Sequence, residues 1–233
     1  MIMGNRILLS LFIGLSWFST QATALTFDWK GTSTTWASST SWTETGGTGD
    51  YPGSGGRTTD IVRFGMTSTF TSQPTLTSSL TIASIEFGGG FQKNGTQVTV
   101  NGATLTVGTI TQDINTTSGS FTIFDYLQGT GTISCTSITI GSGTSTSGAD
   151  NFLLSDVATL NVSGNITITS GTMVLAAGSG SPTLNVGGNV FAAGDGSLAA
   201  CSRNRREKGG AAAEVGAGGG NRSAVNRAWL GLE

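Results

Sequence analysis

The amino-acid sequence predicts an all-β chain that winds into a right-handed parallel β-helix. Helical periodicity is missing between positions 25 and 199, and Ser, Thr and Gly, which are poor helix formers, make up about 44% of the 233 residues. Short apolar–polar–apolar pieces, the pattern of strands with one buried face, recur through this region. The pieces resemble one another at intervals of 24 to 28 residues, which is typical of a solenoid. An antiparallel β-sandwich would contain similar pieces and is the alternative fold.

Residues 1–24 have the three parts of a secretory signal peptide. Arg6 supplies a positive charge, residues 7–18 form a short apolar run, and Ala22-Thr23-Ala24 fits a small-residue cleavage site. The apolar run is shorter than the roughly 20 residues that a membrane-spanning helix needs. We therefore expect cleavage before Leu25, and a mature protein that is secreted or carried to the outer cell surface with no membrane span.

Large aromatic residues are concentrated in the next segment, 25–79. We expect this segment to hold the first strands and an N-terminal cap, because the open end of a stack exposes unpaired strand edges and each large ring buries much apolar area. A sugar-stacking platform is the alternative role for these rings. The aromatic residues concerned are Phe27, Trp29, Trp36, Trp42, Tyr51 and Phe64.

Residues 80–199 are predicted to form the β-helix coils. Aligning the similar sequence segments makes five apolar positions equivalent: Leu80, Leu105, Ile133, Leu160 and Leu184. The spacings between them are 25, 28, 27 and 24 residues. A single coil cannot bury its inward side chains, whereas stacked coils bury a continuous apolar column. We therefore expect the threonines to face outward and four apolar residues in particular to face inward: Ile138, Leu160, Ile166 and Leu184.

Residues 200–233 differ in composition from the coils. This tail carries six basic and three acidic residues, whereas 25–199 carries four basic and ten acidic residues, and no threonine follows Thr183. Three interpretations stay open: a basic arm for anionic partners, a disordered linker, and an out-of-frame end of a longer protein. All three predict a disordered low-complexity tail. The stack would then end near Ala199 with an uncapped edge, through which copies are expected to self-associate.

The composition excludes several classes of site. The chain has no histidine, which rules out a Ser-His-Asp triad, a Cys-His dyad and imidazole metal ligands. Its formal net charge of −2 gives no electrostatic reason to bind nucleic acid. Cys135 and Cys201 could pair in an exported protein, but the strand-like surroundings of Cys135 favour a small buried thiol.

Paired carboxylates are the catalytic option that remains, because some β-helix proteins cleave polysaccharides. The candidates are scattered singly beside turns, where an isolated Asp commonly makes local hydrogen bonds: Asp113, Asp125, Asp150 and Asp156. Calcium-binding repeats need tandem copies, and only the lone fragments 46–50 and 194–196 are present. We therefore expect no catalytic residue, no cofactor and no metal site.

The Thr-x-Thr pairs Thr104/Thr106, Thr109/Thr111 and Thr167/Thr169 raise one further hypothesis, a flat threonine face of the kind that ice-binding solenoids use. The pairs would have to stack over several coils. Asn161 and Asn185 occupy positions equivalent to Thr106, so we expect the array to be interrupted and the threonines to serve as outward strand formers.

The N-terminal segment resembles a family of bacterial proteins. Its opening is similar to that of bacterial surface β-helix proteins, with Ser41 where those proteins usually have Asn: Phe27-Asp-Trp29-Lys-Gly31, Trp36, Ser39-Thr-Ser-Trp42, Tyr51-Pro52 and Asp60-Ile-Val62. The phrases 128–133 and 160–168 are similar to internal coils of the same family. Such proteins resemble autotransporter passengers and large adhesins. The resemblance implies a β-helix at the cell surface without conserved catalytic residues, of which this chain is a truncated fragment.

These features predict a structural or adhesive β-helix, secreted or held at the cell surface, that is not an enzyme. The expected partners are surface glycans or the surfaces of host or neighbouring cells. The alternative is a secreted carbohydrate-binding or carbohydrate-active β-helix. An outward cleft with clustered carboxylates would favour this alternative, whereas uniform Thr, Ser and Asn faces favour the structural role.

Overall fold

The computed structural model describes residues 23–47, 49–65, 72–88, 96–113, 123–141, 151–177, 182–192, 197–202, 214–216 and 225–226. Within them the chain is almost entirely β-structure, with two short 3-10 helices near the N-terminus, η1 (Ser39–Ser41) and η2 (Ser54–Gly56). The strands are β1 (Thr26–Trp29), β2 (Trp42–Thr45), β3 (Ile61–Phe64), β4 (Thr75–Leu76), β5 (Leu80–Gly88), β6 (Gln97–Val100), β7 (Thr104–Asp113), β8 (Ile123–Ile140), β9 (Asn151–Val162), β10 (Ile166–Ile168), β11 (Thr172–Ala177), β12 (Thr183–Val186), β13 (Asn189–Ala192), β14 (Ser197–Ser202), β15 (Glu214–Gly216) and β16 (Val225–Asn226).

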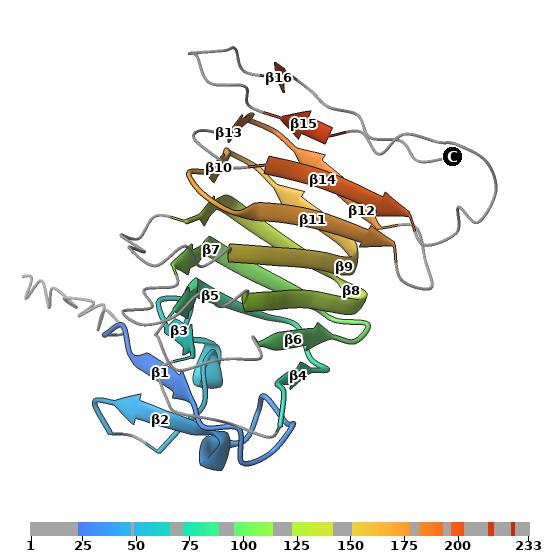
Figure 1. Ribbon diagram of the computed structural model, residues 1–233. Coiled ribbons are helices and arrows are strands. Elements are labelled where there is room, and N and C mark those ends of the chain that lie inside the picture. The colour runs from blue at the N-terminus through green and yellow to red at the C-terminus, as the bar shows by residue number, and fades with distance from the viewer. Residues whose placement is uncertain are drawn as a thin grey trace, which may run out of the picture.

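Successive coils stack in parallel, and Figure 1 shows the stack rising from β1 and β2 to β13 and β14. Long strands bend and contribute to more than one side of the coil, so three faces result. The first face contains residues 80–82, 104–107, 132–135, 159–162 and β12. The second contains β1, β3, 84–88, 109–112, 137–140, β10 and β13. The third contains β4, β6, 123–129, 151–157, β11 and β14.

This pairing confirms the parallel β-helix, and the β-sandwich alternative is wrong. In the described part of the chain, antiparallel pairs occur only at the two ends of the stack, between β1 and β2, β13 and β16, and β14 and β15. A sandwich would need antiparallel neighbours throughout.

The interior column follows the register that the sequence predicts. The five equivalent positions are Cα partners in successive coils: Leu80 with Leu105, Leu105 with Ile133, Ile133 with Leu160, and Leu160 with Leu184. Ile138, Leu160 and Ile166 are buried as expected, and Leu184, in the last coil of the first face, is partly buried against the same core. Polar residues alternate with them and face outward, as a strand with one buried face requires.

Glycine at the corner between the first and second faces lets adjacent coils approach closely. A Cβ atom on Gly108 would lie 2.4 Å from the backbone oxygen of Ala83 in the preceding coil. A Cβ atom on Gly164 would lie 2.6 Å from the backbone oxygen of Thr136. Any larger residue would push the coils apart at these two corners.

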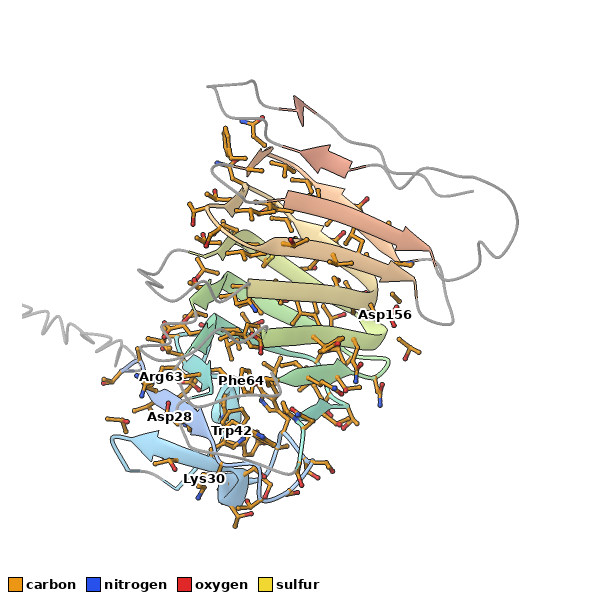
Figure 2. All side chains as sticks on the ribbon, in the orientation of Figure 1. Asp28, Lys30, Trp42, Arg63, Phe64 and Asp156 are labelled. Carbon is orange, nitrogen blue, oxygen red and sulfur yellow. The ribbon has the colours of Figure 1, made fainter. Side chains whose placement is uncertain are left out.

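The aromatic residues close the N-terminal end of the stack, as predicted. Ring centroids lie 4.7 Å apart between Trp29 and Trp42 and 5.0 Å apart between Trp36 and Trp42, in edge-to-face arrangements. These three side chains are at most 2% exposed, and Figure 2 shows Trp42 and Phe64 within the lower end of the stack. Since buried rings cannot stack on sugars, the alternative of an aromatic platform is wrong for these three tryptophans.

The two chain ends are described only in part. The predicted signal peptide lies outside the described residues apart from Thr23 and Ala24. At the other end the last coil continues to Ser202, and β15 and β16 pair with β14 and β13, whereas the sequence predicts an unpaired edge near Ala199. The sequence predicts disorder over the whole of 200–233. Within that range the structure describes 200–202, 214–216 and 225–226, and these residues lie in strands β14, β15 and β16. The rest of the predicted tail, 203–213, 217–224 and 227–233, lies outside the described residues. No helix of the described chain is long and apolar enough to cross a membrane.

Candidate functional site

Asp125, one of the four candidates for a catalytic carboxylate, lies inside the coil. Its side chain is 3% exposed, and it accepts hydrogen bonds at 2.7 Å from the backbone N–H of Thr96 and from Nε2 of Gln112. Burial raises the pKa of the Asp125 carboxyl to about 6, and the hydrogen bonds from Gln112 and Thr96 oppose that rise. A carboxyl enclosed in this way is a structural group and cannot reach a polysaccharide outside the coil.

The structure does not show a second candidate carboxylate paired with Asp125. In register, Asp125 lies opposite Leu153 of β9, so Asp156 is three positions farther along that strand. Asp156 stands between the inward-facing Ser155 and Val157, and Figure 2 places it at the outside of the stack. The side chain of Asp113 and the whole of Asp150 lie outside the described residues.

Asp50, in the fragment 46–50 that resembles part of a calcium-binding repeat, belongs to an ion-pair network of the N-terminal cap. Nη1 of Arg57 lies 3.0 Å from Oδ2 of Asp50, and Nε lies 3.2 Å from Oδ2 of the fully buried Asp60. The guanidinium of Arg57 also lies 5.7 Å from the ring centroid of Phe27. The described residues contain no group of three or more His, Cys, Asp or Glu side chains that could hold a metal ion, and the fragment 194–196 lies outside them.

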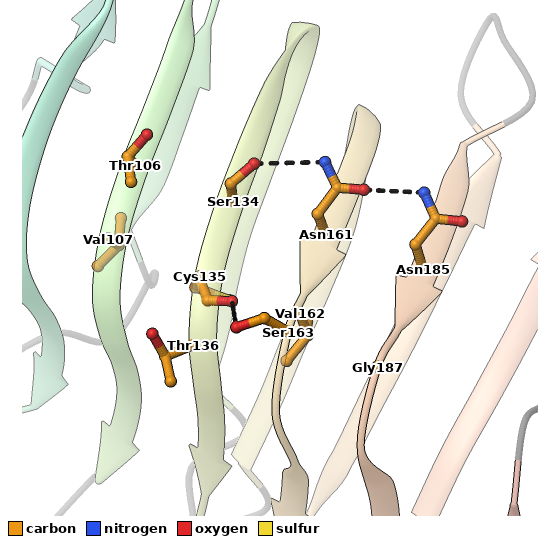
Figure 3. A pocket seen from close by; sticks show the side chains of 10 residues that line it. All are labelled: Thr106, Val107, Ser134, Cys135, Thr136, Asn161, Val162, Ser163, Asn185 and Gly187. Atoms are coloured by element: carbon orange, nitrogen blue, oxygen red, sulfur yellow. Dashed lines mark hydrogen bonds between the residues drawn. The ribbon is translucent and has the colours of Figure 1, made fainter.

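A row of uncharged polar side chains runs along the outside of the first face. Its members are Cα partners in successive coils: Thr81, Thr106, Ser134, Asn161 and Asn185. Nδ2 of Asn185 donates to Oδ1 of Asn161 at 2.8 Å, and Nδ2 of Asn161 donates to Oγ of Ser134 at 3.3 Å. Figure 3 marks both hydrogen bonds as dashed lines. Amides stacked in this way on parallel strands reinforce the pairing of the coils. On this face the predicted interruption of the threonine array by Asn161 and Asn185 is confirmed.

A groove of about 370 Å³ lies along this row. It crosses β7, β8, β9 and β12, so it follows the axis of the stack and not the direction of any one strand. Its lining contains no charged side chain and consists of Thr106, Val107, Ser134, Cys135, Thr136, Asn161, Val162, Ser163, Asn185 and Gly187. Hydroxyl and amide groups can donate and accept hydrogen bonds there, but the lining offers no ion pair, acid or base.

The second face carries an outward column of threonines, two of which, Thr111 and Thr167, belong to the Thr-x-Thr pairs of the sequence analysis. Thr111, Thr139 and Thr167 are Cα partners in three successive coils. The column continues to Phe191, whose side chain is 41% exposed. In the sequence, each of these threonines directly follows an inward isoleucine of the second face. Only the strand register shows that the three residues stack on one another.

The two cysteines lie on different faces of the coil. Cys135 lies on the first face, is 5% exposed and is free. Burial raises the pKa of its thiol to about 12, so it is an unreactive thiol at neutral pH, as the sequence interpretation favoured. Cys201 lies on the third face, in register with Ala176.

No family model, no curated protein and no solved structure matches this chain.

Proposed function

We propose that this chain is a secreted or cell-surface β-helix with a structural or adhesive role and no catalytic activity. The observation that carries the proposal is the combination of a continuous apolar interior with outward rows of uncharged residues on successive coils. A stack of this kind presents the same types of polar contact at every coil, which suits a fibre or a repeated adhesive surface. The resemblance of the N-terminal segment to surface β-helix proteins points in the same direction.

A carbohydrate-binding or carbohydrate-active β-helix is the second candidate. The groove beside Ser134, Asn161 and Asn185 favours binding of carbohydrate. Cleavage of carbohydrate has less support, because Asp125 faces inward and Asp156 lies on the opposite side of the sheet. Binding without cleavage is also compatible with an adhesive role.

Export is tested by labelling intact cells that express the full chain with an antibody against residues 80–199. We expect surface label or antigen in the medium for the full chain, and neither for a variant that lacks residues 2–24. Equal distribution of the two chains would contradict the proposed export.

Adhesion and catalysis are tested with the purified chain that starts at Leu25. Beads coated with the folded protein should attach to neighbouring cells, whereas beads coated with heat-denatured protein should not. Incubation with neutral and acidic polysaccharides should release no reducing or unsaturated sugar ends. Release of such ends by the folded chain would replace the structural proposal by the carbohydrate-active one, and equal attachment of the two kinds of bead would contradict an adhesive role.

A further inference from the structure

The groove on the first face has polar groups that the fold itself leaves unused. Asn161 and Asn185 each donate one hydrogen bond along the row, and Ser134 accepts one. Each amide nitrogen carries a second proton, and the Ser134 hydroxyl still has its own proton to donate. Within the described part of the chain, the hydroxyl of Thr106 and Oδ1 of Asn185 make no hydrogen bond to protein. The groove therefore offers both hydrogen-bond donors and acceptors to a ligand.

The charge and hydrogen-bonding groups of the residues that line the groove favour one class of ligand. An anionic ligand would need Lys or Arg, and a cation would need carboxylates, but the lining has neither. An extended peptide would need a free strand edge, whereas β7, β8 and β9 are paired with neighbours on both sides over the first face. A neutral ligand with many hydroxyl groups satisfies the available donors and acceptors without burying an unpaired charge.

The direction of the groove favours a chain over a single sugar. The polar row repeats once per coil, and neighbouring parallel strands lie about 4.7–4.9 Å apart. A polymer laid along the axis can therefore meet equivalent groups on successive coils, from Thr106 through Ser134 and Asn161 to Asn185. The exposed Thr136 and Ser163 add two hydroxyl-bearing side chains to the lining.

We propose that this groove binds an uncharged polysaccharide chain laid along the axis of the β-helix, across β7, β8, β9 and β12. The inference rests on the proposed adhesive function and gives it a ligand class. Recognition comes from hydrogen bonds to the outward row of the first face, with the Thr106 and Thr136 methyl groups contacting the apolar faces of the sugar rings. The three-threonine column of the second face is a matched outward surface that should not take part.

The test measures binding of the purified chain to dextran, laminarin and galactomannan, with alginate and polygalacturonate as anionic comparators. Thr106→Val and Asn185→Ala each remove a group from the groove, and Thr139→Val is the matched control on the second face. All variants are first checked for unchanged far-ultraviolet circular dichroism and melting temperature. Loss of one hydrogen bond should weaken binding by about threefold to tenfold for each groove variant, and the control should bind like the parent chain.

The possible results separate this inference from the proposed adhesive function. Binding of a neutral polysaccharide that weakens in both groove variants supports the inference, whatever the coated beads do. Binding only to anionic polysaccharides, binding to none, or equal weakening by Thr139→Val would overturn it. If beads adhere to cells while the groove variants adhere equally well and no neutral polysaccharide binds, adhesion stands and the groove is not its site.

Discussion

Replacing Asp125 by Asn should remove the main pH dependence of stability between about pH 5 and pH 8. The carboxyl is buried in the third face, and burial raises its pKa from 3.8 to about 6 even though Thr96 and Gln112 donate hydrogen bonds to it. The chain has no histidine, so no side chain whose ordinary pKa lies in this window competes with the signal.

Proton linkage determines whether stability rises or falls with pH. The folded state holds the Asp125 proton more tightly than the unfolded state, so its contribution to stability is fully present below pH 3.8 and is lost as the pH rises through about 6. The whole shift corresponds to about 3 kcal/mol, and the part that falls between pH 5 and pH 8 to roughly 1 kcal/mol. The protein should therefore be less stable at pH 8 than at pH 5.

Urea unfolding at pH 5 and pH 8, followed by circular dichroism, measures this difference. The parent chain should lose roughly 1 kcal/mol between the two conditions, and the Asp125→Asn chain should lose close to none. The new amide can keep both contacts, because a turn of the Gln112 amide presents Oε1 to the Asn nitrogen. Asp156→Asn, on the outer side of β9, is the control and should behave like the parent chain. Equal or greater stability of the parent chain at pH 8, or the same loss in the Asp125→Asn chain, would refute the reasoning.

Three further predictions concern the coils and the tail. Leu160→Ala should lower the free energy of unfolding by about 2–5 kcal/mol and Thr139→Ala by under about 1 kcal/mol, and comparable urea midpoints for the two variants would mean that the faces are misassigned. Gly108→Ala should cost about 1–3 kcal/mol, because its Cβ would lie 2.4 Å from the backbone oxygen of Ala83, and an unchanged melting temperature would show that this corner is not tightly packed. Trypsin should cut first within 200–233, which holds six basic residues against four in 25–199, and should leave a core with an unchanged melting temperature. Unfolding of the coils after removal of this tail would show that it is a structural cap.

The sequence alone determined the all-β class, the coil repeat and the register of the interior column. The similar sequence segments by themselves align Leu105, Leu160 and Leu184, although the intervals between the five equivalent apolar positions vary from 24 to 28 residues. The reason is physical: the side-chain period of a strand is two, so a slip of one residue would turn a whole apolar set toward water. The loops between strands absorb the differences in length.

The inward residues of the third face were harder to predict from the sequence. Its strands include Asp125 and Ser155 at inward positions, so the apolar–polar alternation is interrupted where the chain buries polar groups. Asp125 becomes acceptable in the interior only because Thr96, from the preceding coil, and Gln112, from the end of β7, supply donors to it. A local pattern holds no information about such partners.

The sequence repeats align Asn161 and Asn185 with Thr106, but only the tertiary structure shows the hydrogen bonds and the groove of this outer surface. Ser134, Asn161 and Asn185 are 24 to 27 residues apart in sequence, and each looks like an ordinary outward strand residue. Stacking brings them into one hydrogen-bonded row beside a groove, and it gathers Thr111, Thr139 and Thr167 into a separate column on the second face. An inward apolar residue can be identified from its own strand where apolar and polar residues alternate regularly, because its burial then follows that local alternation. The neighbours of an outward residue depend on how the coils align, which is set by the corner glycines and the lengths of the loops.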